Sequence, residues 1–243
     1  MFDERDALHH KLLRLLNQAL KRFSLINDGD KILVGLSGGK DSLTLLDLLA
    51  ERQKIYKPLF HLEAVHVRSA FIDYQTDCSY LSNFCLSRGV PLHIVDIAFE
   101  EEDTQRNRVP CFLCAWKRRK TMFEIAQKQG CNKIALGHHK DDIVQTALMN
   151  ISFNGRFDTM AVRQRMHKFP IEIIRPLCNI REDDILRWKE LNDFNSLLKV
   201  CPYERCSKRT SFKKLFEKLQ EDAPDVSSSI FSALAAASKL VQL

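Results

Sequence analysis

KILVGLSGGKDS, residues 31–42, is the stretch that decides the fold of this chain. Its first half is a short apolar run typical of a buried parallel strand, and its second half is a glycine turn with hydroxyls, a cation and a carboxylate. A helix is expected next, because leucines between residues 43 and 49 recur at helical spacing. A helix N-terminus offers unpaired N–H groups and a partial positive charge to an anion. The stretch therefore predicts a phosphate-binding loop between a strand and a helix.

Strands and helices alternate on both sides of this unit. Strands are expected at 31–36, 62–67, 92–97, 133–136 and 171–174. Helices are expected at about 8–23, 43–49, 74–87, 113–129, 141–151, 181–191, 208–219 and 226–240, with loops at 100–110 and 155–166. Such alternation implies a doubly wound parallel sheet, which binds ligands beyond the carboxyl ends of its strands. We predict a Rossmann-like α/β fold over residues 1–180, with an N-terminal helix, and a C-terminal helical extension over 181–243.

The composition is that of an ordinary globular protein. The 243 residues are 45% hydrophobic and 28% charged, and the eight cysteines are too few for a disulfide-stapled scaffold. No segment resembles a signal peptide, and no apolar run approaches the roughly 20 residues that cross a bilayer. We therefore expect a reducing, cytoplasmic environment with no membrane partner. The net charge of +6 permits a polyanionic partner without requiring one.

The loop at 37–42 is neither of the two common glycine-rich nucleotide loops. Gly35 precedes Gly39 and Lys40 by too few residues for GxxxxGK[ST], and the GxGxxG pattern is absent. SGGKDS instead resembles the PP-loop of the ATP pyrophosphatases. The resemblance implies cleavage of ATP between its α and β phosphates, so that a substrate oxygen is adenylated and then displaced by a nucleophile. It also implies ATP contacts along the loop and the second strand, with Asp41 helping to place Mg²⁺. The implied contacts are Leu36, Ser37, Gly38, Gly39, Lys40, Asp41, Ser42 and Val67.

A second motif, Cys111-Phe112-Leu113-Cys114, opens a predicted helix. The spacing brings two sulfurs to one centre, and helix N-termini favour thiolates. A redox dithiol, half of a zinc site and half of an iron–sulfur site are all compatible with this pair. Both metal sites require more cysteines, and Cys201 and Cys206 lie far downstream.

The order of motifs along the chain narrows the resemblance to the tRNA 2-thiocytidine synthetases. SGGKDS is followed by CxxC, by GHHKDD at 137–142, by RPL at 175–177 and by a C-terminal cysteine. The resemblance implies a [4Fe-4S] cluster held by Cys111, Cys114 and Cys201, with one iron left open to carry sulfide. Cys201 matches the family position better than Cys206. If Cys206 also bound, a closed four-thiolate zinc site would be the alternative.

GHHKDD follows an expected strand and begins a helix, so it lies at the same edge as the loop. Taken alone, Asp141 or Asp142 would simply cap that helix. The resemblance assigns Gly137 and His138 to the nucleotide site and makes Asp141 and Asp142 catalytic or metal-binding candidates. It also makes Arg118 a catalytic candidate, within a run of four cations at 117–120. Cations in the first turns of a helix oppose its dipole, so acidic ligands such as ATP or tRNA would compensate them.

These motifs together predict an enzyme that uses ATP and Mg²⁺ to adenylate a tRNA base and an iron–sulfur cluster to deliver sulfur. The resemblance implies C2 of an anticodon-loop cytidine as the target. Enzyme alternatives are a tRNA-Ile lysidine synthetase, which would leave CxxC unexplained, and a thiolase of another tRNA base. An alternative of another class is a zinc-stabilised RNA-binding module that retains ATP, against which the intact loop at 37–42 argues. Expected partners are tRNA, a sulfur donor that is either desulfurase-derived or free sulfide, and a second copy of the chain.

Overall fold

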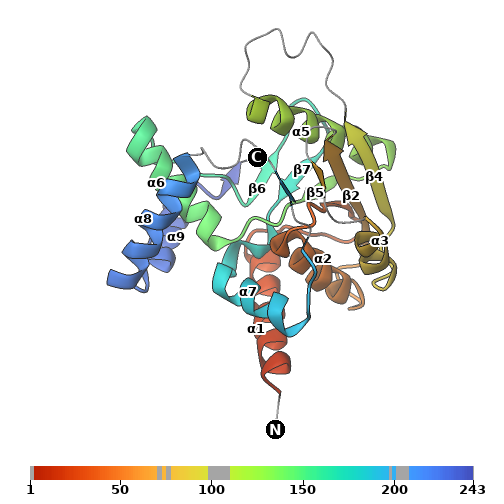
Figure 1. The fold of residues 1–243 in the computed structure, drawn as a ribbon, viewed down its shortest axis with the longest axis horizontal. Helices are drawn as coiled ribbons and strands as arrows, with labels where there is room; N and C mark the ends of the chain where they lie inside the picture. The colour runs from red at the N-terminus through yellow and green to blue at the C-terminus, as the bar shows by residue number, and fades with distance from the viewer. Residues whose placement is uncertain are drawn as a thin grey trace.

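A computed structural model of the protein describes residues 3–69, 73–74, 78–97, 110–196, 199–200 and 208–242. Within these residues, a seven-stranded sheet has the order β4-β2-β1-β5-β7-β6-β9, and β3 and β8 form a separate pair (Figure 1). The strands are β1 (Lys31–Gly35), β2 (His61–Ser69), β3 (Asp73–Tyr74), β4 (Leu92–Ile97), β5 (Lys133–Ala135), β6 (Arg163–Arg165), β7 (Glu172–Ile174), β8 (Lys199–Val200) and β9 (Val241–Gln242).

Parallel pairing dominates the sheet. β1 lies between β2 and β5, and the pairs β2–β4 and β5–β7 extend the parallel arrangement on either side. Among the described pairs of the seven-stranded sheet, only β6 and β7 are antiparallel, and β9 pairs with β6 in parallel. The expected Rossmann-like α/β fold is confirmed.

Helices cover both faces of the sheet. They are α1 (Glu4–Arg22), α2 (Lys40–Gln53), α3 (Ser79–Leu86), α5 (Pro110–Lys128), α6 (Lys140–Asn154), the short 3-10 helix η1 (Pro176–Asn179), α7 (Glu182–Leu191), α8 (Lys208–Asp222) and α9 (Val226–Ala236). Because side chains alternate along a strand, Ile32 and Val34 of β1 pack into the core under α1 and α2, whereas Leu33 packs with Phe123 of α5. Figure 1 shows α5 on one face and α1 and α2 on the other.

The C-terminal segment contacts the rest of the chain at several places. α7 packs against α1 and α2, whereas α8 and α9 pack against α6 (Figure 1). β9 then adds to the edge of the main sheet beside β6. The division at residue 180 stays a prediction.

Four short strands, β3, β6, β8 and β9, were not predicted from the sequence. The helix expected at 74–87 begins only at Ser79, because Asp73–Tyr74 form β3 and pair with β8. The loop expected at 155–166 contains β6, and the helix expected to reach residue 240 ends at Ala236, before β9. Each of these strands has two or three residues, too few for an alternating pattern, and forms only by pairing with a segment distant in sequence.

Some expectations fall on residues outside the described part. Most of the loop expected at 100–110 does so, although Pro110 already belongs to α5. Cys201 and Cys206 also lie outside the described residues. Among the helices that are described, none has the length and hydropathy needed to cross a membrane.

Candidate active site

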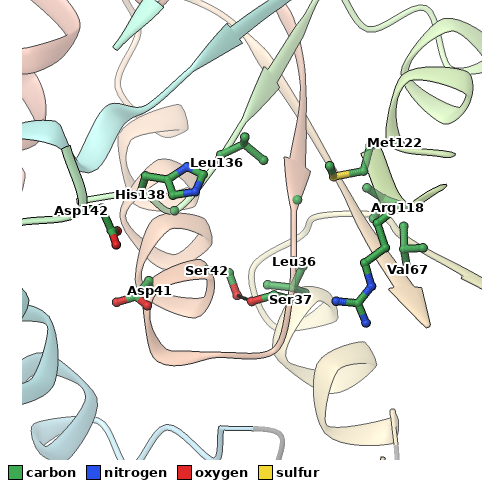
Figure 2. A pocket seen from close by; sticks show the side chains of 13 residues that line it. Leu36, Ser37, Asp41, Ser42, Val67, Arg118, Met122, Leu136, His138 and Asp142 are labelled. Carbon is green, nitrogen blue, oxygen red and sulfur yellow. Dashed lines mark hydrogen bonds between the residues drawn. The ribbon is translucent and has the colours of Figure 1, made fainter. Parts of the chain in front are cut away.

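A cavity of about 340 Å³ opens at the carboxyl ends of β1, β2 and β5, on the side covered by α5 (Figure 2). One part of its wall is apolar, and the other carries hydroxyls, carboxylates and a histidine. Its lining comprises Gly35, Leu36, Ser37, Asp41, Ser42, Val65, Val67, Arg118, Met122, Leu136, Gly137, His138 and Asp142. This is the strand edge at which doubly wound sheets bind ligands.

The glycine turn presents the start of α2 to the cavity. Gly38 has φ +82°, a conformation that residues with a side chain rarely adopt. The Ser42 hydroxyl donates to the Gly39 carbonyl at 3.0 Å and lies 3.1 Å from the Ser37 hydroxyl. Gly39 is the N-cap, and no side chain caps the helix. The first N–H groups of α2 therefore remain available to an anion.

Gly137 allows the turn after β5 to press against this loop. A Cβ atom on Gly137 would lie 2.9 Å from the backbone carbon of Asp41 and 3.0 Å from the amide nitrogen of Ser42. Real Cβ atoms do not approach other atoms this closely. The turn after β5 and the start of α2 thus form one continuous wall.

Nine of the residues expected at the site line the cavity. They are Leu36, Ser37, Asp41, Ser42, Val67, Arg118, Gly137, His138 and Asp142. Gly38, Gly39 and Lys40 belong to the same turn but not to the lining, and Asp141 lies outside it. Figure 2 shows Asp41 and Asp142 on one side of the cavity and Arg118 on the other.

The two adjacent aspartates have different surroundings. Asp141 is buried, and its two carboxylate oxygens accept hydrogen bonds from the Ser227 hydroxyl at 2.5 Å and the Glu182 amide at 2.8 Å. It therefore ties α6 to α7 and α9. Asp142 faces the cavity and accepts a hydrogen bond from the His139 amide at 3.1 Å.

Lys40 is held beside the cavity by two carboxylates. Its Nζ lies 2.8 Å from Asp41 Oδ1 and 3.0 Å from Glu182 Oε1, and Lys213 of α8 also contacts Glu182 at 2.9 Å. Burial alone would lower the pKa of Lys40, but the two carboxylates outweigh it and raise that pKa. Burial likewise opposes ionisation of Glu182, yet Lys213 and Lys40 lower its pKa to about 2. The lysine and the glutamate are both ionised at neutral pH.

The acidic side of the cavity suits a cation that also contacts phosphate. The buried imidazole of His139 lies 3.4 to 3.8 Å from carboxylate oxygens of Asp41, Asp141 and Asp142. Across the described part of the chain, no group of three or more His, Cys, Asp or Glu side chains would hold a metal ion by itself. Mg²⁺ often binds through one or two carboxylates, with substrate phosphates completing its coordination. Asp41 and Asp142 fit that use, because both face the cavity.

α5 connects the cavity with the CxxC motif. Cys114, Arg118 and Met122 recur at intervals of four residues and so share one face of the helix, and Arg118 and Met122 line the cavity. Cys114 is half-buried, about 6 Å along the helix axis from Arg118 at 1.5 Å per residue. Cys111 lies in the first turn of α5. The motif therefore lies within two helical turns of the cavity.

Sequence reasoning missed part of the site. Gly35, Val65, Met122 and Leu136 belong to the lining. The four-residue spacing from Arg118 to Met122, which places both on one face of a helix, was the available signal for Met122. Arg175, from the RPL motif, lies behind the lining with Nε 3.3 Å from His138 Nδ1. Its contact depends on the meeting of β5 and β7, which no local pattern reveals.

Comparison with known proteins identifies the family. The PP-loop domain family matches residues 7–195. The tRNA-cytidine(32) 2-sulfurtransferase of Delftia acidovorans is 33% identical over 95% of this chain and 74% of its own length. The protein of the same name from Syntrophotalea carbinolica is 34% identical over 94% and 90%. The chain belongs to the tRNA-cytidine(32) 2-sulfurtransferase family.

A solved structure supports the assignment to this sulfurtransferase family. The U34-tRNA thiolase NcsA from Methanococcus maripaludis, solved with its [4Fe-4S] cluster, superposes with a TM-score of 0.78 at 27% identity. The similarity covers 96% of this chain and 79% of NcsA. The SGGKDS and GHHKDD motifs thus meet at one cavity, and CxxC lies on the helix that forms the far wall of that cavity.

Proposed function

We propose that this chain is an ATP-dependent tRNA sulfurtransferase that replaces the C2 oxygen of a tRNA cytidine with sulfur. The observation that carries the proposal is the cavity between the phosphate loop and α5, because α5 also bears the CxxC motif. The names of the curated relatives favour cytidine 32 as the target. The reaction requires ATP, the base and sulfur to meet in one place, and this arrangement provides such a place.

ATP fits the two kinds of wall in the cavity. The uncapped start of α2 and the hydroxyls of Ser37 and Ser42 suit phosphate oxygens. The apolar side chains of Val67 and Met122 suit the adenine ring. Asp41 and Asp142 would hold Mg²⁺ against the phosphates.

The chemistry then takes two balanced steps. The C2 oxygen of the base attacks the α-phosphorus of ATP, and pyrophosphate leaves. A sulfur nucleophile next attacks C2, and AMP leaves with the original oxygen. Lys40, the N–H groups of α2 and Arg118 would stabilise the negative charge that builds on the phosphate oxygens.

Two of the three cysteines expected to hold a [4Fe-4S] cluster belong to the helix that borders the cavity. Cys111 and Cys114 open α5, where the helix N-terminus favours thiolates. Val200, the residue before Cys201, pairs with Asp73, four residues beyond the carboxyl end of β2. That pairing brings the residue before Cys201 close to the end of β2, which supports a third ligand from this segment of the chain. If three cysteines hold the cluster, one iron would stay open to carry the sulfur nucleophile.

Metal analysis of cysteine variants tests the cluster. The protein is purified anaerobically and its iron, sulfide and zinc are quantified for the wild type and for Cys111→Ala, Cys114→Ala, Cys201→Ala and Cys206→Ala. Cys78→Ala is the matched control, since Cys78 is half-buried like Cys114 but lies outside CxxC. We expect iron and sulfide in the wild type, Cys206→Ala and the control, and their loss in the other three variants. Stoichiometric zinc without iron would overturn the sulfur-delivery proposal.

Nucleoside mass spectrometry of tRNA tests the substrate. Cells that lack the protein should lose one 2-thiolated cytidine, and the intact gene should restore it, whereas a gene carrying Lys40→Ala should not. Loss of a thiolated uridine instead would identify a thiolase of another base, and loss of lysidine a lysidine synthetase. An unchanged profile would exclude tRNA thiolation. Magnesium use, the sulfur donor, a homodimer and a cytoplasmic location stay predictions.

A further inference from the structure

We propose that Arg175 is a positioning residue that holds His138 as a neutral imidazole with its proton on Nε2, so that His138 donates a hydrogen bond to a phosphate oxygen of bound ATP. The identity of the ligand rests on the proposed function. The tautomer itself follows from the contacts of the protein. The RPL motif thereby acquires a role at the cavity, although Arg175 does not line it.

Arg175 is placed rigidly behind the cavity wall. It directly follows β7 and is 7% exposed. Its amide donates to the Val162 carbonyl at 2.9 Å, and its Nη1 donates to the Ala161 carbonyl. Its Nε then points at His138, with 3.3 Å between Nε and Nδ1.

The direction of this hydrogen bond decides where the proton of His138 lies. Arginine has five N–H donors and no acceptor, so Nδ1 of His138 must accept. Burial, followed by the charge of Arg119, lowers the pKa of Arg175 to about 10, which leaves it charged at neutral pH. A neutral imidazole that accepts at Nδ1 carries its proton on Nε2.

The same contact disfavours an imidazolium. A second positive charge on His138 would lie beside a buried guanidinium in a poorly solvated place. Within the described part of the chain, no carboxylate forms an ion pair with that guanidinium, whose hydrogen bonds go to His138 and Ala161. The carboxylate of Asp142 offsets the charge of Arg175 only in part, because the positive charge of Arg119 has the larger effect, so Arg175 favours an anion in the cavity.

His138 lies where its Nε2–H can donate a hydrogen bond to a phosphate oxygen. It lines the cavity beside Gly137, whose backbone touches the start of α2. Figure 2 shows its imidazole on the same side as Asp41 and opposite Arg118. A neutral donor at this point can stabilise negative charge that develops during adenylation without taking up a proton. Removing one such donor from a preorganised site typically lowers kcat about 100-fold or more.

The direct test is the ¹⁵N spectrum of the histidine rings in the wild-type protein at neutral pH. The signal of His138 is assigned by its absence in His138→Gln. We expect a protonated Nε2 and an unprotonated Nδ1, with Nε2–H shifting on addition of a non-hydrolysable ATP analogue. An Nδ1–H tautomer, an imidazolium or an Nε2–H signal unmoved by the analogue would overturn the inference.

Variants separate positioning from a purely structural effect. Arg175→Met removes the donor and the charge, and Arg163→Met is the control because it breaks the neighbouring ion pair with Glu172 away from the cavity. For ATP-dependent pyrophosphate release, we expect about a 100-fold loss of kcat with a smaller change in KM for Arg175→Met and for His138→Gln, and no further loss in the double variant. Arg163→Met should keep both the tautomer and kcat. Additive losses in the double variant would contradict the inference.

This experiment distinguishes failure of the inference from failure of the proposed function. The tautomer and its response to the ATP analogue require neither tRNA nor iron. If the tautomer holds but tRNA is not thiolated, only the proposed substrate is wrong. If thiolation holds and the Nδ1–H form is found, only the role of Arg175 is wrong.

Discussion

Two glycines shape the phosphate side of the cavity for different physical reasons. Gly38 is needed for its backbone conformation, since φ +82° is strained for any residue with a side chain. Gly137 is needed for space, since its turn lies against the backbone of Asp41 and Ser42. Glycine is therefore required at position 38 by the local backbone conformation and at position 137 by a tertiary contact.

Gly137→Ala tests the requirement for space. The added Cβ forces the turn after β5 away from α2, so we expect destabilisation of about 1 to 3 kcal/mol and weaker ATP binding. Chemical denaturation and calorimetric titration with an ATP analogue measure the two effects. Gly39→Ala is the stability control, because its Cβ would meet only the Ser37 hydroxyl, at 3.5 Å. Equal stability of Gly137→Ala and wild type would refute the steric argument.

The hydrogen bonds of the single residue Asp141 are also expected to stabilise the fold. Ser227→Ala removes the donor to one oxygen of a buried carboxylate and should destabilise the fold by about 1.5 to 3 kcal/mol. Ser228→Ala, an exposed neighbour on α9, should change stability little. Urea denaturation of both variants gives the comparison. Similar unfolding free energies for the two variants would mean that the hydrogen bond from Ser227 to Asp141 does not stabilise the fold.

At the scale of elements, Glu182 links the phosphate loop to the C-terminal helices. Its carboxylate contacts Lys40 at the start of α2 and Lys213 on α8, and its amide donates to Asp141 on α6. Three helices that are distant in sequence therefore meet at the first residue of α7. The position of Lys40 depends on where this helix begins.

This link predicts a pH dependence of stability. Because the pKa of Glu182 is lowered from 4.5 to about 2 in the folded protein, its ionised form stabilises the fold above about pH 4.5, and that contribution is lost as the pH falls toward 2. The difference in unfolding free energy between wild type and Glu182→Gln should accordingly shrink over that range. Glu217→Gln, an exposed carboxylate on α8, provides the control. A difference that stays constant with pH would show that the charge of Glu182 is not what stabilises the contact.

At the scale of the whole molecule, positive charge lies beside the cavity. α5 carries Lys117, Arg118, Arg119 and Lys120 two residues beyond CxxC, and Arg119 and Lys120 are exposed. The sheet places this helix over the carboxyl ends of β1 and β2. A polyanion that reaches the cavity would therefore pass these cations.

tRNA binding should depend on salt, and part of the dependence should arise from α5. Replacing Arg119 and Lys120 by Ala should reduce the slope of log K against log salt concentration by roughly 0.7 to 0.9 for each phosphate that these side chains neutralise. Lys54→Ala, at the opposite end of α2, should leave the slope unchanged. Binding measured at several KCl concentrations tests both. The same slope in all three proteins would place the RNA elsewhere.

The sequence by itself determined the strand–loop–helix unit at 31–49, the alternation that specifies a parallel sheet, and most of the cavity lining. These features depend on local sequence, because leucine spacing, a glycine turn and short apolar runs each specify structure within a few residues. The same locality explains why the start of α3, β6 and β9 were not predicted. A strand of two or three residues exists only through its partner, and no pattern within it identifies that partner.

Only the tertiary structure decided which members of each motif face the cavity. Asp141 and Asp142 are adjacent and chemically identical, but α7 and α9 bury the first whereas the second lines the cavity. Arg175 meets His138 only because β5 and β7 are neighbours in the sheet. The physical reason is that a side chain's role depends on the dielectric and the partners around it, and both come from segments far away in sequence.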